Sequence, residues 1–242
     1  MLPLTDVNPT RRTPYVTYAL IAINVVVFLS QLTLSPRELQ FTFLNDAIVP
    51  LLVTRDPFSV ETLLDFVRSM FFHGGWLHLL SNMLYLWIFG DNIEDRLGKL
   101  LYLVLYFASG FAAGFAQVAI SPESRIPLVG ASGAIAGVLG AYALMFPNAT
   151  VRGLIVFGFV ADIIELPAML VLGFWFVTQL FSGVASLGVD TMTGGVAFFA
   201  HIGGFVAGLA LTWVFMQIVP QPPIDQRREW LYRRYGRPYD DF

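Results

Sequence analysis

Residues 130–146 read GASGAIAGVLGAYALMF, an uncharged stretch with one serine, Ser132, close to its start. As a helix, about 16 apolar residues measure roughly 24 Å, somewhat less than the hydrocarbon core of a bilayer. Small residues recur at four-residue spacing in Gly133, Gly137 and Ala141. Such a stripe is typical of helices that pack closely inside a membrane. The stretch therefore predicts a short membrane helix that starts beside Ser132 and ends before Pro147.

The rest of the chain has the composition of a membrane protein. Of 242 residues, 56% are hydrophobic and only 13% are charged, which does not suit a water-facing surface. There is no cysteine, which excludes disulfides, thiolate metal sites and a cysteine nucleophile. We predict an all-α membrane protein.

Six apolar runs are long enough to be spanning helices. Together they predict a six-helix bundle over residues 15–219, between an N-terminal segment (1–14) and a C-terminal tail rich in Arg and aromatic residues (220–242). The interval before the fifth run is ambiguous, and we interpret Leu154 to Val160 as an interfacial or partly re-entrant segment. The runs are Tyr15 to Leu32, Trp76 to Phe89, Leu100 to Ile120, Ala131 to Phe146, Leu166 to Ser186 and Val196 to Val219.

Charge placement predicts the orientation of these six runs. If both termini are cytoplasmic, most Arg and Lys residues fall on cytoplasmic segments, as the positive-inside bias requires. Residues 31–69 then form a long external loop whose own apolar residues would lie in the outer interface. We expect no cleavable signal peptide, and a multi-pass protein of a bacterial plasma membrane.

All three histidines of the chain lie in or beside apolar runs, namely His73, His78 and His201. Ionisable side chains at membrane depth are costly and indicate function by default, although any one of them could simply hydrogen-bond a neighbouring helix. Helix rise places Ser132 and His201 at similar depth below the outer surface. His78 and Asn82, one helical turn apart, lie in the same outer half. A hydroxyl, an imidazole and polar donors are thus expected to converge.

At these residues the sequence resembles the rhomboid family. The resemblance implies an intramembrane serine protease with Ser132 as nucleophile, His201 as its base, and His78 and Asn82 in the oxyanion hole. His73 would have a structural or water-organising role, and Gly130, Gly133, Gly204 and Gly208 would support the site. The matching segments are His73-Gly74-Gly75-Trp76-Leu77-His78, Asn82, Gly90 to Gly98 with Glu94 and Arg96, Gly130-Ala131-Ser132-Gly133, Ala200-His201-Ile202-Gly203-Gly204 and Gly208.

The chemistry expected is acyl transfer by a Ser-His pair. Serine needs a base, and histidine is suited to that task near neutral pH. No acidic residue is suitably placed for a triad: Asp162 and Glu165 are expected near the cytoplasmic side, and Asp190 in an external turn. No metal or other cofactor is expected, because the chain has no HExxH pattern.

The expected partners are single-span or multi-span membrane-protein substrates and the lipid bilayer, and no nucleic acid. Two other functions remain open. A catalytically inactive rhomboid-like protein would bind membrane clients without cleaving them. A transporter would need ionisable residues along the whole bilayer depth, whereas here they cluster in the outer half.

Overall fold

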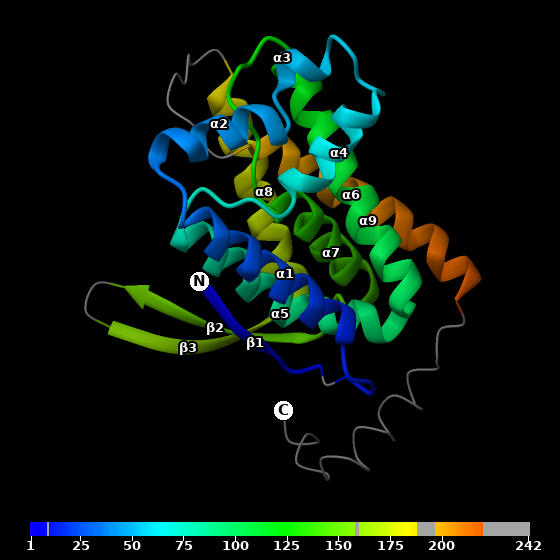
Figure 1. The fold of residues 1–242 in the computed structure, drawn as a ribbon. Helices are drawn as coiled ribbons and strands as arrows, with labels where there is room; N and C mark the ends of the chain where they lie inside the picture. The colour runs from blue at the N-terminus through cyan, green and yellow to red at the C-terminus, as the bar shows by residue number, and fades with distance from the viewer. Residues whose placement is uncertain (9, 158–159, 188–196, 220–242) are drawn as a thin grey trace, which may run out of the picture.

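The computed structural model describes residues 1–8, 10–157, 160–187 and 197–219. The chain is mostly helical, and a helix lies at each of the six places where the sequence predicts an apolar run (Figure 1). The C-terminal tail from residue 220 and the turn expected around Asp190 lie outside the described residues. The helices of the bundle are α1 (Tyr15–Gln31), α5 (Trp76–Leu97), α6 (Lys99–Ile120), α7 (Ser132–Met145), α8 (Ala168–Ser186) and α9 (Phe198–Ile218).

Helix α7, which lies within the apolar stretch 130–146, forms the centre of the bundle. It contacts α5, α6, α8 and α9, and every residue from Gly133 to Ala143 is buried. Its glycines allow the close packing. A Cβ at Gly137 would clash with the Ser109 side chain of α6, and one at Gly140 with the Phe205 carbonyl of α9. The small-residue stripe thus packs α7 between two helices, as its spacing predicts.

Helix α5 continues beyond the expected end of its apolar run at Phe89, through a charged turn to Leu97. The buried Glu94 explains this extension. Its carboxylate accepts hydrogen bonds from the backbone N–H groups of Val16 (2.9 Å) and Thr17 (2.8 Å), which begin α1. Since Pro14 gives α1 no side-chain cap, Glu94 satisfies its first N–H groups from the neighbouring helix.

A three-stranded antiparallel sheet, order β1-β2-β3, lies beside the helix ends (Figure 1). It consists of β1 (Leu2–Asp6), β2 (Thr150–Phe157) and β3 (Val160–Pro167). Residues 154–157 and 160 of the segment predicted as interfacial or re-entrant belong to β2 and β3, so the all-α prediction was wrong and the fold is mostly helical. Residues 151–156 alternate between buried Val151 and Gly153 and exposed Arg152 and Val156, a two-residue period that favours a strand.

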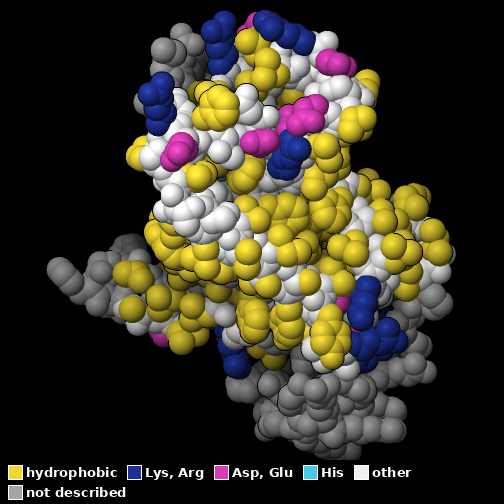
Figure 2. All heavy atoms as spheres, in the orientation of Figure 1, with side chains coloured by type: hydrophobic (Ala, Val, Ile, Leu, Met, Phe, Trp, Pro, Cys, Tyr) yellow, Lys and Arg dark blue, Asp and Glu magenta, His cyan; other side chains and the backbone are white. Residues whose placement is uncertain are grey.

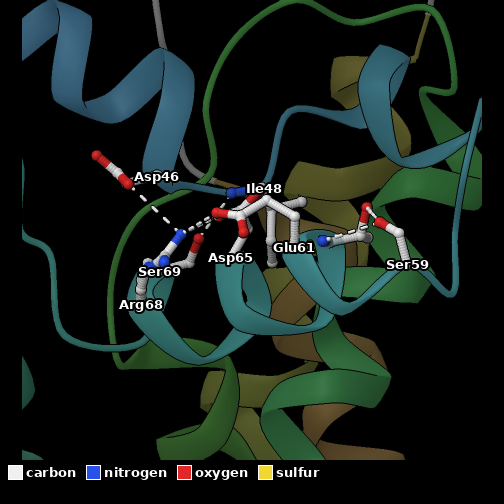
Figure 3. A network of polar contacts seen from close by, with 8 residues as sticks. Asp46, Ile48, Ser59, Glu61, Asp65, Arg68 and Ser69 are labelled. Atoms are coloured by element: carbon white, nitrogen blue, oxygen red, sulfur yellow. Dashed lines mark hydrogen bonds and ion pairs between the residues drawn. The ribbon is translucent and has the colours of Figure 1, made fainter.

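The long segment between α1 and α5 folds into short helices rather than an open loop. These are α2 (Pro36–Asp46), α3 (Pro50–Val53) and α4 (Val60–Ser69). Figure 3 shows Arg68 of α4 directed at Asp46, Glu61 and Asp65, at 3.4, 2.6 and 3.0 Å. Arg68 is about one third exposed, so these ion pairs add little stability and mainly orient α4 against α2.

Ser69, at the end of α4, connects this outer region to α7. Its hydroxyl accepts a hydrogen bond from the Ile48 N–H at 2.7 Å (Figure 3), and its carbonyl accepts one from the Gly130 N–H at 2.8 Å. The outer helices are thereby tied to the backbone two residues before Ser132.

The surface matches a protein embedded in lipid. Hydrophobic side chains cover the middle of the molecule, whereas Lys, Arg, Asp and Glu side chains gather at its two ends (Figure 2). Within the described residues, three helices are long and apolar enough to cross a membrane, α6, α8 and α9, while α1 and α7 are apolar but shorter. Large side chains such as Phe174 and Phe181 of α8 are largely exposed, as expected for a helix facing lipid.

Candidate active site

Ser132 and His201 are in direct contact. The His201 Nε2 atom lies 2.9 Å from the Ser132 Oγ, a distance typical of a hydrogen bond. Ser132 is the first residue of α7, whose cap residue Ala131 provides no side-chain hydrogen bond. The N–H groups of a first helical turn have no intrahelical partners, so they are available to an anion at this end.

Glycines allow α9 to bring His201 this close. A Cβ at Gly204 would clash with the Gly133 carbonyl oxygen, and one at Gly208 would clash with the Gly137 carbonyl oxygen. The predicted supporting glycines on the two helices therefore face one another across their interface. The N-terminal end of α9 is also anchored to α6, because the Ala200 N–H donates to the Gln117 Oε1 at 3.3 Å.

His78 lies close to Gly130, two residues before the serine. A Cβ at Gly130 would be only 2.6 Å from His78 Nε2 and 3.6 Å from Ser132 Oγ. Gly130 also has a φ of +129°, which side chains other than glycine rarely allow. The Gly74 N–H approaches His78 Nδ1 at 3.4 Å and favours an acceptor there. A neutral His78 then carries its proton on Nε2, the nitrogen near Ser132.

Asn82 is buried one turn further along α5. Its Nδ2 donates to the His78 carbonyl oxygen at 2.9 Å, so one of its two amide hydrogens is used within the helix. The structure brings Asn82 beside His78 but records no hydrogen bond between its amide and Ser132. Only the second amide hydrogen of Asn82 is then available to a bound ligand.

His73 is almost fully buried, with 1% of its surface exposed, and packs edge-on against the ring of His78 at 5.0 Å. Gln31 of α1 makes two hydrogen bonds to the His73 backbone: its Nε2 donates to the His73 carbonyl (2.8 Å), and its Oε1 accepts from the His73 N–H (3.1 Å). The His73 ring thus packs against the His78 ring, and His73 does not contact Ser132 in the structure.

A small cavity of about 50 Å³ opens beside Ser132. Its volume suits a few water molecules or a small side chain. Small and apolar residues from α4, α6, α7 and α9 make up most of its wall, including Phe66, Gly110, Ala113, Ala134 and Ala200.

Two residues of α8 complete the surroundings of His201, and the sequence reasoning missed both. Gln179 Oε1 lies 2.8 Å from His201 Nδ1, and the Trp175 ring lies 5.8 Å from the imidazole. The sequence did contain a signal for them: Gln179 is a polar amide inside an apolar run, and it follows Trp175 by four residues, so the two share one helix face.

Comparison with known proteins identifies the family. The model of the Rhomboid domain matches residues 60–218, which include Ser132, His201, His78 and most of the bundle. The chain belongs to the rhomboid family. With its apolar helices, this rhomboid is an integral membrane protein.

Its relatives come from several organisms and include proteins named as mitochondrial and chloroplastic. It is 30% identical over 207 residues to Rhomboid protein 1, mitochondrial, of Saccharomyces cerevisiae, a match that covers 84% of this chain and 54% of the relative. It is 28% identical over 168 residues to Rhomboid-like protein 11, chloroplastic, of Arabidopsis thaliana, covering 66% and 55%. Rhomboid protease GluP of Bacillus subtilis is 41% identical over 69 residues, covering 28% and 13%. The chain thus spans about half the length of the first two relatives.

Proposed function

We propose that this rhomboid is an intramembrane serine endopeptidase in which Ser132 is the nucleophile and His201 the general base. The observation that carries the proposal is the 2.9 Å contact between Ser132 Oγ and His201 Nε2 at the uncapped start of α7. A base must lie within hydrogen-bond distance of the proton that it removes, and this pair meets that requirement before any substrate is bound.

The reaction would proceed through an acyl-enzyme. As Ser132 Oγ attacks the scissile carbonyl carbon, its proton moves to His201 Nε2, and the C–O bond forms while the carbonyl becomes an oxyanion. His201 then protonates the amine nitrogen as the C–N bond breaks. Water, deprotonated by His201, attacks the ester carbonyl carbon; the C–O bond to Ser132 breaks, the carboxylic acid product leaves, and His201 returns the proton to Ser132 Oγ.

The oxyanion would be stabilised at the start of α7. The Ser132 N–H belongs to the first helical turn, and the His78 Nε2–H lies next to Gly130, beside the same hydroxyl. Asn82 could add its second amide hydrogen, since the first is bonded to the His78 carbonyl. Donors fixed in this way before the reaction need no rearrangement in the transition state.

Substrates would be membrane-spanning proteins whose helix is unwound near the cut, because helical hydrogen bonds hide the peptide carbonyls. The cavity of about 50 Å³ beside Ser132 favours a small residue at the position before the scissile bond.

The proposal includes a topology of six spans with both termini cytoplasmic, over a domain of residues 15–219. The outer helices α2 to α4 and the site would lie on one side of the membrane and the β-sheet on the other. The bacterial plasma membrane remains a prediction, because the relatives above include mitochondrial, chloroplastic and bacterial proteins.

In this cysteine-free chain, Ser121→Cys should react from outside with an impermeant thiol reagent, and Val156→Cys only after the membrane is opened. Labelling of both in intact cells would contradict the topology.

Reaction with a fluorophosphonate tests the activated serine directly. The wild-type protein in detergent should be labelled at Ser132, Ser132→Ala should not be labelled, and His201→Ala should be labelled far more slowly. Ser186→Ala serves as a matched control, because within the described residues that hydroxyl donates only to the Gly183 carbonyl of its own helix. Equal labelling of wild type and His201→Ala would refute the assigned base. A wild type without labelling would favour the inactive, client-binding alternative.

A further inference from the structure

Gln179 connects the peripheral helix α8 to the proposed base. His201 makes two hydrogen bonds in opposite directions, through Nε2 to Ser132 Oγ at 2.9 Å and through Nδ1 to Gln179 Oε1 at 2.8 Å. Ser132, His201 and Gln179 come from α7, α9 and α8, so one polar chain joins three helices. The proposed protease mechanism uses only the first of these two bonds.

The neighbours of Gln179 determine which end of its amide faces His201. The Thr178 hydroxyl donates its only hydrogen to the Trp175 carbonyl at 2.6 Å, so its oxygen can only accept from other groups. The Gln179 Nε2 lies 3.4 Å from this oxygen and acts as the donor. The amide nitrogen is therefore turned toward Thr178, which leaves the carbonyl oxygen for His201.

This orientation fixes the tautomer of the imidazole. Because Gln179 Oε1 can only accept, His201 Nδ1 must carry a hydrogen. In a neutral imidazole the other nitrogen, Nε2, then has a free lone pair, and this nitrogen faces the Ser132 hydroxyl. A base that accepts a proton from Ser132 needs this tautomer, and the opposite one could not act.

We propose that Gln179 is a positioning residue that holds His201 in the Nδ1–H tautomer; the inference rests on the proposed protease function. Gln179 would do the orienting task that a carboxylate performs in a triad, without a buried charge in an apolar helix. Trp175, one turn earlier on α8, supports the same orientation from the face of the imidazole, with ring centroids 5.8 Å apart.

The proposal makes the base depend on where α8 lies. Only Ala168, Leu172 and Gly183 of α8 are buried, so it is the least enclosed helix of the bundle among those described in full. A displacement of α8 would withdraw the Gln179 carbonyl and release the imidazole.

The test compares Gln179→Leu and Gln179→Glu in the full-length protein. Gln217→Leu is the matched control, because it makes the same change at an exposed glutamine whose hydrogen bond, among the described residues, is to the Trp213 carbonyl of its own helix. Loss of one orienting hydrogen bond should lower kcat of Gln179→Leu about tenfold, with KM nearly unchanged. Gln179→Glu still offers an acceptor oxygen and should recover most of this loss. It should also move the acidic side of the pH–rate profile to higher pH, an effect that a packing role would not produce.

The second readout does not require proteolysis. Nitrogen-15 NMR of His201, assigned with His201→Ala, should show the Nδ1–H form in wild type, Gln217→Leu and Gln179→Glu, and a mixture of tautomers in Gln179→Leu. If the wild type cleaves no substrate, the proposed function fails while this spectrum still decides the role of Gln179. An unchanged tautomer in Gln179→Leu, or a loss of kcat that Gln179→Glu does not recover, would overturn the proposal.

Discussion

Gly204→Ala tests whether the close contact of α7 and α9 creates the site. The added Cβ would clash with the Gly133 carbonyl oxygen and lie 3.0 Å from its carbonyl carbon and 3.4 Å from the Ala113 Cβ. These obstacles are backbone and a Cβ, which no rotamer change can move aside. Since ordinary carbon contacts are about 3.5–4.0 Å, the two helices must separate by roughly 1 Å.

That separation is enough to break the proposed dyad. The contact between Ser132 Oγ and His201 Nε2 would lengthen from 2.9 Å to beyond the range of a hydrogen bond. A misplacement of about 1 Å can reduce turnover about 10²-fold. Overpacking should cost about 1–3 kcal/mol of stability, of which about 1 kcal/mol is recovered because alanine favours helix over glycine.

The assay is the initial rate of cleavage of a single-span substrate in liposomes, together with the unfolding transition of the same preparation. Gly173→Ala on α8 is the matched control, because a Cβ there meets no atom of the described residues within 4 Å. This control should keep its rate and should lose no stability; the helix preference of alanine over glycine adds up to about 1 kcal/mol there. A Gly204→Ala protein that cleaves at the wild-type rate would refute the link between this interface and the site.

Three further predictions concern other parts of the molecule. Glu94→Gln should lower the stability by about 1–3 kcal/mol, measured by chemical unfolding, because an amide cannot replace the carboxylate that accepts from two N–H groups of α1; an unchanged transition would contradict this. Burial raises the pKa of Asp6 to about 7, so the docking of β1 should weaken as pH rises from about 4 to 7. The measurement is hydrogen exchange of the Val7 N–H, corrected for its intrinsic pH dependence, and Asp6→Asn should not show this change. Substrates with alanine before the cut should react about tenfold faster than those with phenylalanine, and equal rates would refute the role of the cavity beside Ser132.

The sequence predicted the helices of the bundle well because their signal is strong and local. Apolar length predicts where each helix lies in the sequence, and the glycine stripes on α7 and α9 predict which faces meet. The juxtaposition of Ser132 and His201 followed from depth and motif, and the structure places their side chains in contact. Glu94 was noted in the sequence as part of the segment that matches the family. Its role as a cap for α1 depends on a contact between distant segments, which the local sequence does not show.

The errors arose where a signal was short or depended on tertiary partners. The sequence predicted an interfacial or partly re-entrant segment at Leu154 to Val160 within an all-α fold, but this region forms β2 and β3, and a third strand from Leu2–Asp6 completes a sheet. That partner lies about 150 residues away in the chain, so local pattern could not reveal it. Gln179 was overlooked for a related reason: the sequence shows one amide in an apolar run, but not that this amide faces the His201 imidazole on another helix.

The central claim is that Ser132 and His201 form a protease dyad, and the most direct measurement is cleavage of a purified single-span substrate by the purified protein in liposomes. The wild type should cut the substrate within or near its span, and Ser132→Ala, which removes one oxygen atom and little packing volume, should leave it intact while its helical content and unfolding transition stay the same. Cleavage by Ser132→Ala at the wild-type rate would contradict the account.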